Sequence, residues 1–573
     1  MDYKLKIAES IHLVLQEDLT KEDIYSLLER PKLEEHGDLA FPTFQLARIF
    51  KKNPKEIASD LAGKISSDLV DQVEAVGPYL NFHLNRKTVS SAIIQEILDQ
   101  DENYGDQSVG QGQNVPIDMS SPNIAKPMSM GHLRSTVIGN ALANIMEKMG
   151  FNPIKINHLG DWGTQFGKLI YAYKTWGDPQ AIEENPIPEL LRIYVKFHEE
   201  AEANPELEDQ GRLWFAKLEQ GDSEALELWK KFRALSLEEF NKIYQRLNVE
   251  FDSYNGEAFY NDKMDQTLEL IENSGKLVED QGAQIIKLDK YDLNPALIKK
   301  KDGSTLYITR DIAAAIYRKR EYDFAQALYV VGQEQANHFK QLKGVLQELG
   351  FDWAQDIHHI PFGLITKDGQ KLSTRKGKLV LLEDVLDEAS KRALEQIEDK
   401  NPDLANKEEI ADQVGVGAVV FHDLKNDRMN NFDFTIEEVV QFEGETGPYV
   451  QYSRVRALSI LENSQADLGP KQVQGLEDDH AWSVVKLLEK FPNVLSRASK
   501  NYDPSLIAKY VIDLSQAFNK YYANVRVLDE DGDLTSRLAL VKAVEILIKI
   551  NLHLLGLSSC LLYTSDAADE RSS

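Results

Sequence analysis

The succession of strand, loop, helix and strand that begins at Val115 constrains the fold of this chain more than any other feature. VPIDMSS has the pattern of a buried strand, a loop with two prolines follows, a helix is predicted from about Gly131 to Met149, and PIKINHLGDWG predicts a second strand. Strands that are joined through a helix pair in parallel within one sheet. Further along, ALYVVG at Ala327–Gly332 is a short apolar run suited to another buried parallel strand. We therefore expect a doubly wound parallel sheet with helices on its faces.

The 573 residues are too many for one hydrophobic core, so we expect several domains. Helical patterns near the N-terminus and an alternating strand from Val76 predict a small α+β unit, which a glycine cluster ends. A long acidic helical stretch then interrupts the sheet, and strand and helix alternation is expected to resume near Ala283. The expected organisation is an N-terminal α+β domain over 1–112, a Rossmann-like α/β domain over 113–378 with a helical insertion at about 179–282, a connecting helical region over 379–440, a C-terminal all-α bundle over 441–557, and an irregular tail over 558–573 that we interpret as non-native.

Composition excludes several classes of protein. The single cysteine, Cys560, rules out an intrachain disulfide framework and a cysteine-ligated zinc site. The chain starts without a basic leader and contains no run of about 18 apolar residues, so we expect a cytoplasmic protein that does not contact membranes. The net charge of -28 argues against indiscriminate binding of nucleic acid, because such affinity comes mainly from Lys and Arg on phosphates. A specific RNA partner remains compatible with a local basic face.

The loop and helix after the first strand carry groups that suit a phosphate. Gly131-His132 stands where the helix begins, so free backbone N–H groups and the positive end of the helix dipole face a bound anion. Lys126 adds a mobile positive charge, Ser129 a hydroxyl donor and His132 a ring donor. Each of these alone is more often an ordinary surface residue. Their convergence favours a site for phosphate chemistry.

A second loop, ITKDGQKLSTRKGKLV at Ile365 to Val380, is basic and lies between apolar strands. Its glycines make it flexible, so it can close over a triphosphate. The side chains expected to stabilise a leaving pyrophosphate are Lys371, Ser373, Arg375, Lys376 and Lys378. A solvated basic loop without such a role is the alternative interpretation.

These segments resemble a known family. PMSMGHLRST resembles the HIGH motif of class I aminoacyl-tRNA synthetases, and KLSTR resembles their KMSKS loop, in the expected order. SSPNIAKP before the first motif and NHLGDWGTQFGKL after it resemble the arginyl-tRNA synthetase branch, and the resemblance covers about residues 1 to 557. In one departure, Ser129 replaces the first histidine of the HIGH pattern. Because a hydroxyl carries no positive charge, more of the electrostatic work falls to His132, Lys126 and the loop of Lys371.

The resemblance implies a pocket for the guanidinium of L-arginine. Tyr307 and Asp311 lie one helical turn apart, so the carboxylate can pair with the guanidinium while the phenol packs or hydrogen-bonds beside it. A family carboxylate corresponds to Asn152 here. The second partner of the guanidinium is therefore left open.

The resemblance also assigns residues to the rest of the arginine site. Asn157 and Gln335 match family positions that hold the amino-acid head of the substrate, and Asp161 is expected to support the same strand end. Ser121 and Asn123, in the loop after the first strand, complete the expected arginine-binding set. A site with fixed polar groups can reject, by roughly 10⁴-fold, a substrate that lacks the matching hydrogen-bonding groups. No separate editing domain is therefore required.

Both ends of the chain resemble RNA-binding parts of the family. ETGPYVQYSRVRA places Tyr449, Tyr452 and Arg456 on one helical face, where rings and a guanidinium suit splayed bases. The resemblance identifies this as the anticodon-binding helix, and three residues of FNKYYANVRV are expected to face the same RNA loop: Tyr521, Tyr522 and Arg526. Tyrosines at helical spacing also fit core packing. The N-terminal segments HGDLAFPTFQLAR and GPYLNF resemble the family domain that contacts the tRNA elbow.

The predicted function follows from this resemblance. ATP, bound with Mg²⁺ and without any protein-bound zinc, activates L-arginine to arginyl-adenylate with release of pyrophosphate, and the arginine is then transferred to tRNA(Arg). We expect activation to require bound tRNA, and we expect a monomer.

Three alternatives remain open. Another synthetase with a HIGH motif, such as the cysteinyl or methionyl branch, often uses cysteine-ligated zinc, and no cysteine precedes Cys560. A small-molecule ligase that forms adenylates lacks a long helical C-terminal region. A catalytically silent RNA-binding paralogue fits less well, because His132, Lys126, Lys371 and Asp311 are all retained.

Overall fold

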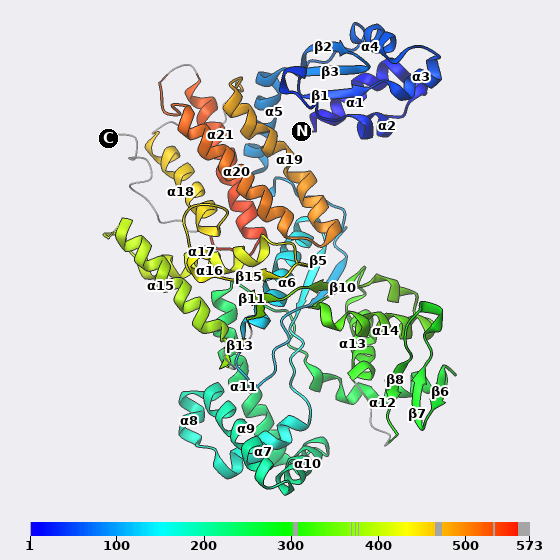
Figure 1. Ribbon diagram of the computed structural model, residues 1–573, viewed down its shortest axis with the longest axis vertical. Coiled ribbons are helices and arrows are strands. Elements are labelled where there is room, and N and C mark those ends of the chain that lie inside the picture. Colours follow the sequence, from blue (N-terminus) through cyan, green and yellow to red (C-terminus); the bar gives the residue numbers. More distant parts are fainter. Residues whose placement is uncertain are drawn as a thin grey trace.

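The computed structural model describes residues 2–301, 307–367, 369–372, 374–375, 378–400, 402–464, 473–530 and 533–559. The N-terminal unit is an antiparallel sheet of order β1-β3-β2 with helices beside it (Figure 1). Its elements are α1 (Tyr3–Leu15), α2 (Lys21–Leu27), β1 (Leu39–Pro42), α3 (Phe44–Phe50), α4 (Pro54–Ala62), β2 (Val70–Val76) and β3 (Tyr79–Leu84). The segment from Val76 was predicted to be one strand, but Gly77 has a φ of 61° and turns the chain, so β2 and β3 form a hairpin.

The next helix, α5 (Arg86–Gln100), packs against the C-terminal helices α19 and α21. The helix that follows the N-terminal unit therefore lies beside the C-terminal helices, as Figure 1 shows for the blue and orange segments. Trp482 of α19 donates from Nε1 to Asp38 at 2.9 Å and ties the N-terminal unit to the same helices.

The predicted parallel sheet is confirmed. Its order is β10-β9-β4-β5, and every neighbouring pair is parallel. The strands are β4 (Asn114–Asp118), β5 (Asn152–Ile156), β9 (Ala327–Gly332) and β10 (Ile357–Phe362). Helix α6 (Met130–Lys148) connects β4 to β5, and α14 (Ala336–Glu348) connects β9 to β10. The order places the carboxyl ends of β4 and β9 side by side, which is where ligands bind in sheets of this type.

A long interruption separates β5 from β9. It contains α7 (Thr164–Trp176), α8 (Pro179–Glu184), α9 (Pro186–Ala203), α10 (Glu206–Glu219), α11 (Ser223–Arg246), α12 (Met264–Asn273), β6 (Leu277–Asp280), β7 (Ala283–Ile286), β8 (Ala296–Lys299) and α13 (Tyr307–Tyr322). Strands and helices do alternate again from Ala283, but the first of these strands are not part of the main sheet, because β6, β7 and β8 form a separate antiparallel sheet. Two residues join β6 to β7, and such a short connection can only make a hairpin. The parallel sheet resumes at β9.

The rest of the chain is largely helical, as predicted. Short strands come first: β11 (Ile365–Lys367), β12 (Gln370–Lys371), β13 (Thr374–Arg375) and β14 (Lys378–Leu379), and β15 (Phe432–Asp433) pairs in parallel with β11. The helices are α15 (Leu382–Lys400), α16 (Lys407–Leu424), α17 (Ile436–Val439), α18 (Gly447–Asn463), α19 (Asp479–Asn501), α20 (Ser505–Asn524) and α21 (Leu534–Leu554). Among the described residues, no helix is long and apolar enough to cross a bilayer. Residues from 560 onward, including Cys560 and most of the expected tail, lie outside the described residues.

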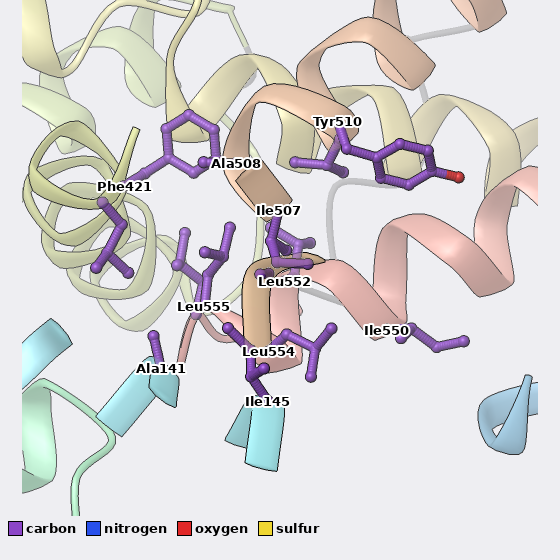
Figure 2. Close-up of a cluster of buried hydrophobic side chains, with 14 of the residues drawn as sticks. Ala141, Ile145, Phe421, Ile507, Ala508, Tyr510, Ile550, Leu552, Leu554 and Leu555 are labelled. Carbon is purple, nitrogen blue, oxygen red and sulfur yellow. The ribbon is translucent and has the colours of Figure 1, made fainter. Parts of the chain in front are cut away.

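One hydrophobic core joins the sheet domain to the helical bundle. Figure 2 shows Ala141 and Ile145 of α6 beside Phe421 of α16, Ile507 of α20 and Leu552 of α21. Each of these side chains is at most 1% exposed. Because burial of apolar area is the main favourable term in folding, α6 is held from both its sheet side and its bundle side.

A buried ion pair crosses the same junction. Arg134 of α6 and Asp423 of α16 are each 1% exposed, with Nε 3.2 Å from Oδ2. Arg134 also donates to the carbonyl of Gly363 at 2.9 Å and of Asn430 at 3.1 Å. Burial raises the pKa of the Asp423 carboxyl, and Arg134 opposes that shift. The start of α6 is thus linked to the end of β10 and to the connecting helices.

Candidate active site

A cavity of about 280 Å³ opens at the carboxyl ends of β4, β9 and β10. Ser120 and Ser121 line it after β4, Gly332 and Gln335 after β9, and Gly363 after β10. The N-terminus of α6 closes another side through Gly131 and His132. The cavity therefore combines the edge of a parallel sheet with the positive end of a helix, and this combination suits an anionic ligand.

His132 is held in one tautomer at the start of α6. The backbone N–H of Ser129 donates to Nδ1 of His132 at 3.0 Å, so Nδ1 carries no proton and Nε2–H is the ring donor. Burial lowers the pKa of His132, and the ring stays neutral near pH 7. The Ser129 hydroxyl lies 3.3 Å from the same Nδ1. His132 is consequently a neutral hydrogen-bond donor, which leaves positive charge to Lys126 and the basic loop.

Lys126 is exposed, and its Nζ lies 5.5 Å from the ring centroid of Tyr194 in α9. A cation over an aromatic ring is held loosely, with roughly 0.5–1 kcal/mol of attraction at an exposed position. The ammonium can therefore leave the ring to meet a phosphate.

The basic loop approaches the start of α6 directly. The backbone N–H of Met130 donates to the carbonyl of Val380 at 3.1 Å, and that of Leu382 donates to Met128 at 2.9 Å. The two predicted phosphate motifs are therefore neighbours. The backbones of Lys371, Arg375 and Lys378 lie in β12, β13 and β14, and the structure does not describe their side chains; Ser373 and Lys376 lie outside the described residues.

The loop after β4 has a constrained backbone. Ser120, Ser121 and Ala125 have φ values of 76°, 58° and 64°, in the left-handed region that non-glycine residues seldom adopt. Asn123 forms a bridge to Gly160, and a Cβ on Gly160 would lie 2.1 Å from the Asn123 side chain. The predicted SSPNIAKP and NHLGDWG segments thus touch each other, and Gly160 is required for that contact.

Two residues predicted at the end of β5 are buried. Asn157 is 0% exposed, and Asp161 is 1% exposed. Asp161 pairs with Arg233 of α11 at 2.9 Å and accepts from the backbone N–H of Ala258 at 2.8 Å. Asp161 therefore holds the loop in place, which agrees with its expected supporting role.

Carboxylates gather where the guanidinium was expected. Asp311, on α13, accepts from Nε2 of His338 at 2.6 Å. Burial raises the pKa of Glu257 to about 7; Arg310 lowers it, and the nearby carboxylates Asp161 and Asp311 raise it. A site with several carboxylates that repel one another is completed electrostatically by a cation. Tyr307 begins α13, but its side chain is not described.

Asn152 does not belong to this group. It is exposed at the amino end of β5, and its side chain donates to Asn114 at the amino end of β4. The cavity is at the opposite end of the sheet, so the correspondence drawn at Asn152 is wrong as a guide to the guanidinium site. Glu257 was missed because it begins a short 3-10 helix after α11 and belongs to none of the family motifs that the sequence analysis used.

A second buried ion pair supports the floor of the site. Arg318 of α13 and Asp118 of β4 lie 2.7 Å apart, and Nη2 of Arg318 is 3.4 Å from the ring of His158. Asp118 could have been noticed in the sequence as a charged residue at the end of an apolar strand. The sequence interpretation did not use this signal. Together with Arg134, Tyr244 and His338, these residues are polar partners that only spatial proximity reveals.

The predicted RNA-facing residues form a cluster on α18 and α20. The guanidinium of Arg456 lies 4.9 Å from the ring centroid of Tyr452 and 5.3 Å from that of Tyr522. Asn519 donates to the Tyr449 hydroxyl at 2.9 Å and accepts from Arg456. Arg526 is exposed at the end of α20.

Tyr521 does not join this cluster. It is 0% exposed, and burial raises the pKa of its hydroxyl well above the usual value. Its assignment to the RNA-contacting set is corrected, because neighbouring residues on a helix point about 100° apart and Tyr521 points into the core while Tyr522 does not.

The fold and the site define an α/β protein whose parallel sheet opens on a cavity beside a helix N-terminus, with a basic segment next to that helix. Family models agree with this class and refine it: the class I (R) tRNA synthetase catalytic domain matches residues 93–436, the DALR anticodon binding domain matches 450–560, and the arginyl tRNA synthetase N terminal domain matches 1–84.

Similar proteins extend along nearly the whole chain. It is 63% identical over 557 residues to the arginine–tRNA ligase of Enterococcus faecalis, covering 97% of this chain and 99% of that one, and 59% identical over 560 residues to that of Ligilactobacillus salivarius, covering 98% and 99%. Among solved structures, the arginyl-tRNA synthetase of Thermus thermophilus has a TM-score of 0.79 at 24% identity, covering 97% of this chain and 99% of that one. The chain belongs to the arginyl-tRNA synthetase family of class I aminoacyl-tRNA synthetases. The predicted fold class and ligase activity are thereby confirmed.

Proposed function

We propose that the cavity at the start of α6 carries out arginine activation with the residue roles that follow. A carboxylate oxygen of L-arginine attacks the α-phosphorus of ATP, and the bond to the β-phosphate oxygen breaks to release pyrophosphate. The terminal ribose hydroxyl of tRNA(Arg) then attacks the adenylate carbonyl and AMP leaves. The observation that carries this proposal is the antiparallel bridge between Ser129 and Leu381, which brings the end of the basic loop beside the start of α6.

ATP is expected to lie against α6. His132 would donate from Nε2, the positive end of the α6 dipole at Gly131 would face the phosphates, and Lys126 would neutralise phosphate oxygens. Lys371, Ser373, Arg375 and Lys376 would act on the leaving pyrophosphate, with Mg²⁺ entering as part of the ATP complex. No step requires a side-chain nucleophile.

Arginine is expected to lie between β5, α13 and the segment of Glu257. Asp311 and Glu257 would share the guanidinium: burial is the largest cause of the raised pKa of Glu257, and a cation there would favour its ionised form. Asn157 would accept from the α-ammonium, with Gln335 at the cavity wall. Ser121 and Asn123 would complete the site from the loop after β4, and Tyr307 from the first turn of α13.

The pKa of Glu257 makes arginine binding depend on pH. With a pKa of about 7 the carboxyl is mostly protonated at pH 6 and mostly ionised at pH 8 in the empty enzyme. Because the guanidinium requires the ionised form, the Kd for arginine should fall about tenfold between pH 6 and pH 8. Calorimetric titration of arginine across this range measures the effect. The Glu257→Gln variant should bind arginine more weakly at pH 8 and show a flat profile, and a variant that keeps the wild-type slope contradicts the assignment.

Transfer RNA is expected to contact both ends of the chain. The Tyr449, Tyr452, Tyr522 and Arg456 cluster offers rings and a guanidinium to splayed anticodon bases. In the N-terminal unit, Phe44 is 52% exposed and stands edge-on to Tyr79 at 5.7 Å, and Tyr79 lines a cavity together with Arg30, Lys32 and Glu29. This surface suits the tRNA elbow. We further propose that activation requires bound tRNA and that the enzyme is a cytoplasmic monomer.

Exchange of radioactive pyrophosphate into ATP, measured with each of the twenty amino acids, tests the whole proposal. Arginine alone should support exchange, and only when tRNA(Arg) is present. Exchange with a different amino acid would refute the specificity. Exchange with arginine but without tRNA would refute only the proposed tRNA requirement.

A further inference from the structure

In the side-chain amide of Asn157, the nitrogen has a hydrogen-bond partner, but the oxygen has none among the described residues. Its Nδ2 donates to the hydroxyl of Tyr244 at 3.0 Å. Its Oδ1 is fully buried and has no hydrogen-bond partner among the described residues. A buried carbonyl oxygen normally has a donor, so this oxygen remains available to accept a hydrogen bond. The α-ammonium of arginine is such a donor.

Tyr244 stands directly behind this amide. It belongs to α11, is 2% exposed, and lies 2.7 Å from Oγ of Ser120 as well as 3.0 Å from Nδ2 of Asn157. Because an amide nitrogen only donates, the Tyr244 oxygen must accept from Asn157, and its own proton then goes to Ser120. Burial raises the pKa of Tyr244 well above its usual value, so the hydroxyl keeps that proton.

Helix α11 holds Tyr244 rigidly against the substrate loops. Oγ of Ser236 accepts from the backbone N–H of Ala125 at 2.9 Å, and Arg233 pairs with Asp161 at 2.9 Å. At the end of the helix, Arg246 pairs with Asp412 of α16 at 2.7 Å. The hydroxyl is therefore presented by a helix attached to both the site and the connecting helices.

We propose that Tyr244 is a positioning residue for recognition of the substrate's α-ammonium. By accepting from Nδ2, its hydroxyl allows the amide of Asn157 to present only its oxygen to the arginine site. The inference rests on the proposed contact between Asn157 and the α-ammonium. Without the hydroxyl, the same orientation leaves Nδ2 buried without an acceptor, and the opposite orientation turns N–H donors toward a cation.

The Tyr244→Phe variant removes the hydroxyl and keeps the ring. Arginine should bind about 5- to 150-fold more weakly, which corresponds to about 1–3 kcal/mol for an unsatisfied buried group. Guanidinovalerate, the arginine analogue without the α-amino group, should bind with unchanged affinity, as should ATP. Calorimetry with the full-length protein measures all three. Tyr254→Phe is the matched control, because that hydroxyl donates to Asn241 and not to a residue of the site.

The ratio of arginine to guanidinovalerate affinity separates the possible results. An arginine-selective loss with an unchanged melting temperature supports the inference. If both compounds lose affinity equally, Tyr244 contributes only to packing. If neither compound loses affinity, Tyr244 has no role in binding. Either result overturns the inference. If the wild-type protein binds both compounds equally, the contact between Asn157 and the ammonium is itself wrong, which is a distinct failure of the proposed function.

Ser120→Ala tests the same hydrogen-bond chain from its other end. Without an acceptor at Ser120, the Tyr244 hydroxyl turns its proton to Asn157 and favours the wrong amide orientation. The same arginine-selective loss is expected, while equal affinity loss for arginine and guanidinovalerate would overturn the inference.

Discussion

Replacing Asp311 by Ala should lower kcat/KM for arginine by about 30- to 5,000-fold while leaving the KM for ATP nearly unchanged. Asp311 lies on α13 and is held by Nε2 of His338 at 2.6 Å, so its carboxylate is oriented before the substrate arrives. Removing one partner of a hydrogen-bonded charge pair costs about 2–5 kcal/mol, mainly because the other charge remains desolvated and unpaired. Steady-state kinetics of tRNA charging, with arginine and ATP varied in turn, give both constants.

Two further variants test whether the charge of Asp311 is the cause of the lost kcat/KM for arginine. Asp311→Asn keeps the shape and removes the charge, so it should lose nearly as much activity as the alanine variant. Glu321→Ala, at an exposed carboxylate near the end of the same helix, should behave like wild type. A mainly raised KM for ATP, or full activity in Asp311→Asn, would contradict the assignment of Asp311 to the guanidinium.

The largest effect on stability is expected at Glu545. The side chains of Arg454 in α18 and Glu545 in α21 are 4% and 3% exposed, and Nη2 lies 2.7 Å from Oε1. Glu545→Ala leaves a buried guanidinium with no carboxylate beside it within the described residues, and breaking such a pair costs about 3–5 kcal/mol. The unfolding transition of the helical bundle should therefore move to clearly lower temperature, as measured by circular dichroism and calorimetry.

The neighbouring Lys542 provides the control. It pairs with the other oxygen of Glu545 at 2.7 Å, but its side chain is 37% exposed, so Lys542→Ala should cost no more than about 1 kcal/mol. The double variant Arg454→Met with Glu545→Leu should recover most of the loss, because apolar side chains replace both buried charges. An Arg454→Met, Glu545→Leu protein as unstable as Glu545→Ala would show that packing, and not the unpaired charge, is responsible.

Features with a regular period were predictable from the sequence. The strand at Ala327–Gly332 was predicted with its observed bounds, because a strand buried on both faces reads as a continuous apolar run. The start of α6 beside Gly131 was predicted to within one residue from the change of loop to helix pattern. The hairpin after Val76 and the antiparallel sheet around Ala283 were missed, because strand patterns do not state which strands pair.

The residues of the proposed arginine site also fall into a group that the sequence could indicate and a group that it could not. Family motifs mark Asp311, Asn157 and Gln335, and Gln335 lies in the wall of the cavity, while its predicted contact with the substrate stays a prediction. Glu257 and Tyr244 carry no such mark. They come from the segment between β5 and β9, and their roles depend on which groups the folded chain sets beside them.

By itself, the sequence determined the parallel sheet, the start of helix α6 and the membership in a class of enzyme, since these depend on local periodicity and on contiguous motifs. Only the tertiary structure decided that Tyr521 is a core residue, that Asn152 lies at the wrong end of β5, and that α11 carries a hydroxyl to Asn157. The physical reason is that burial, pKa and hydrogen-bond partners arise from contacts between residues far apart in the sequence, such as the 87 positions between Asn157 and Tyr244, and these contacts exist only once the core has brought the residues together.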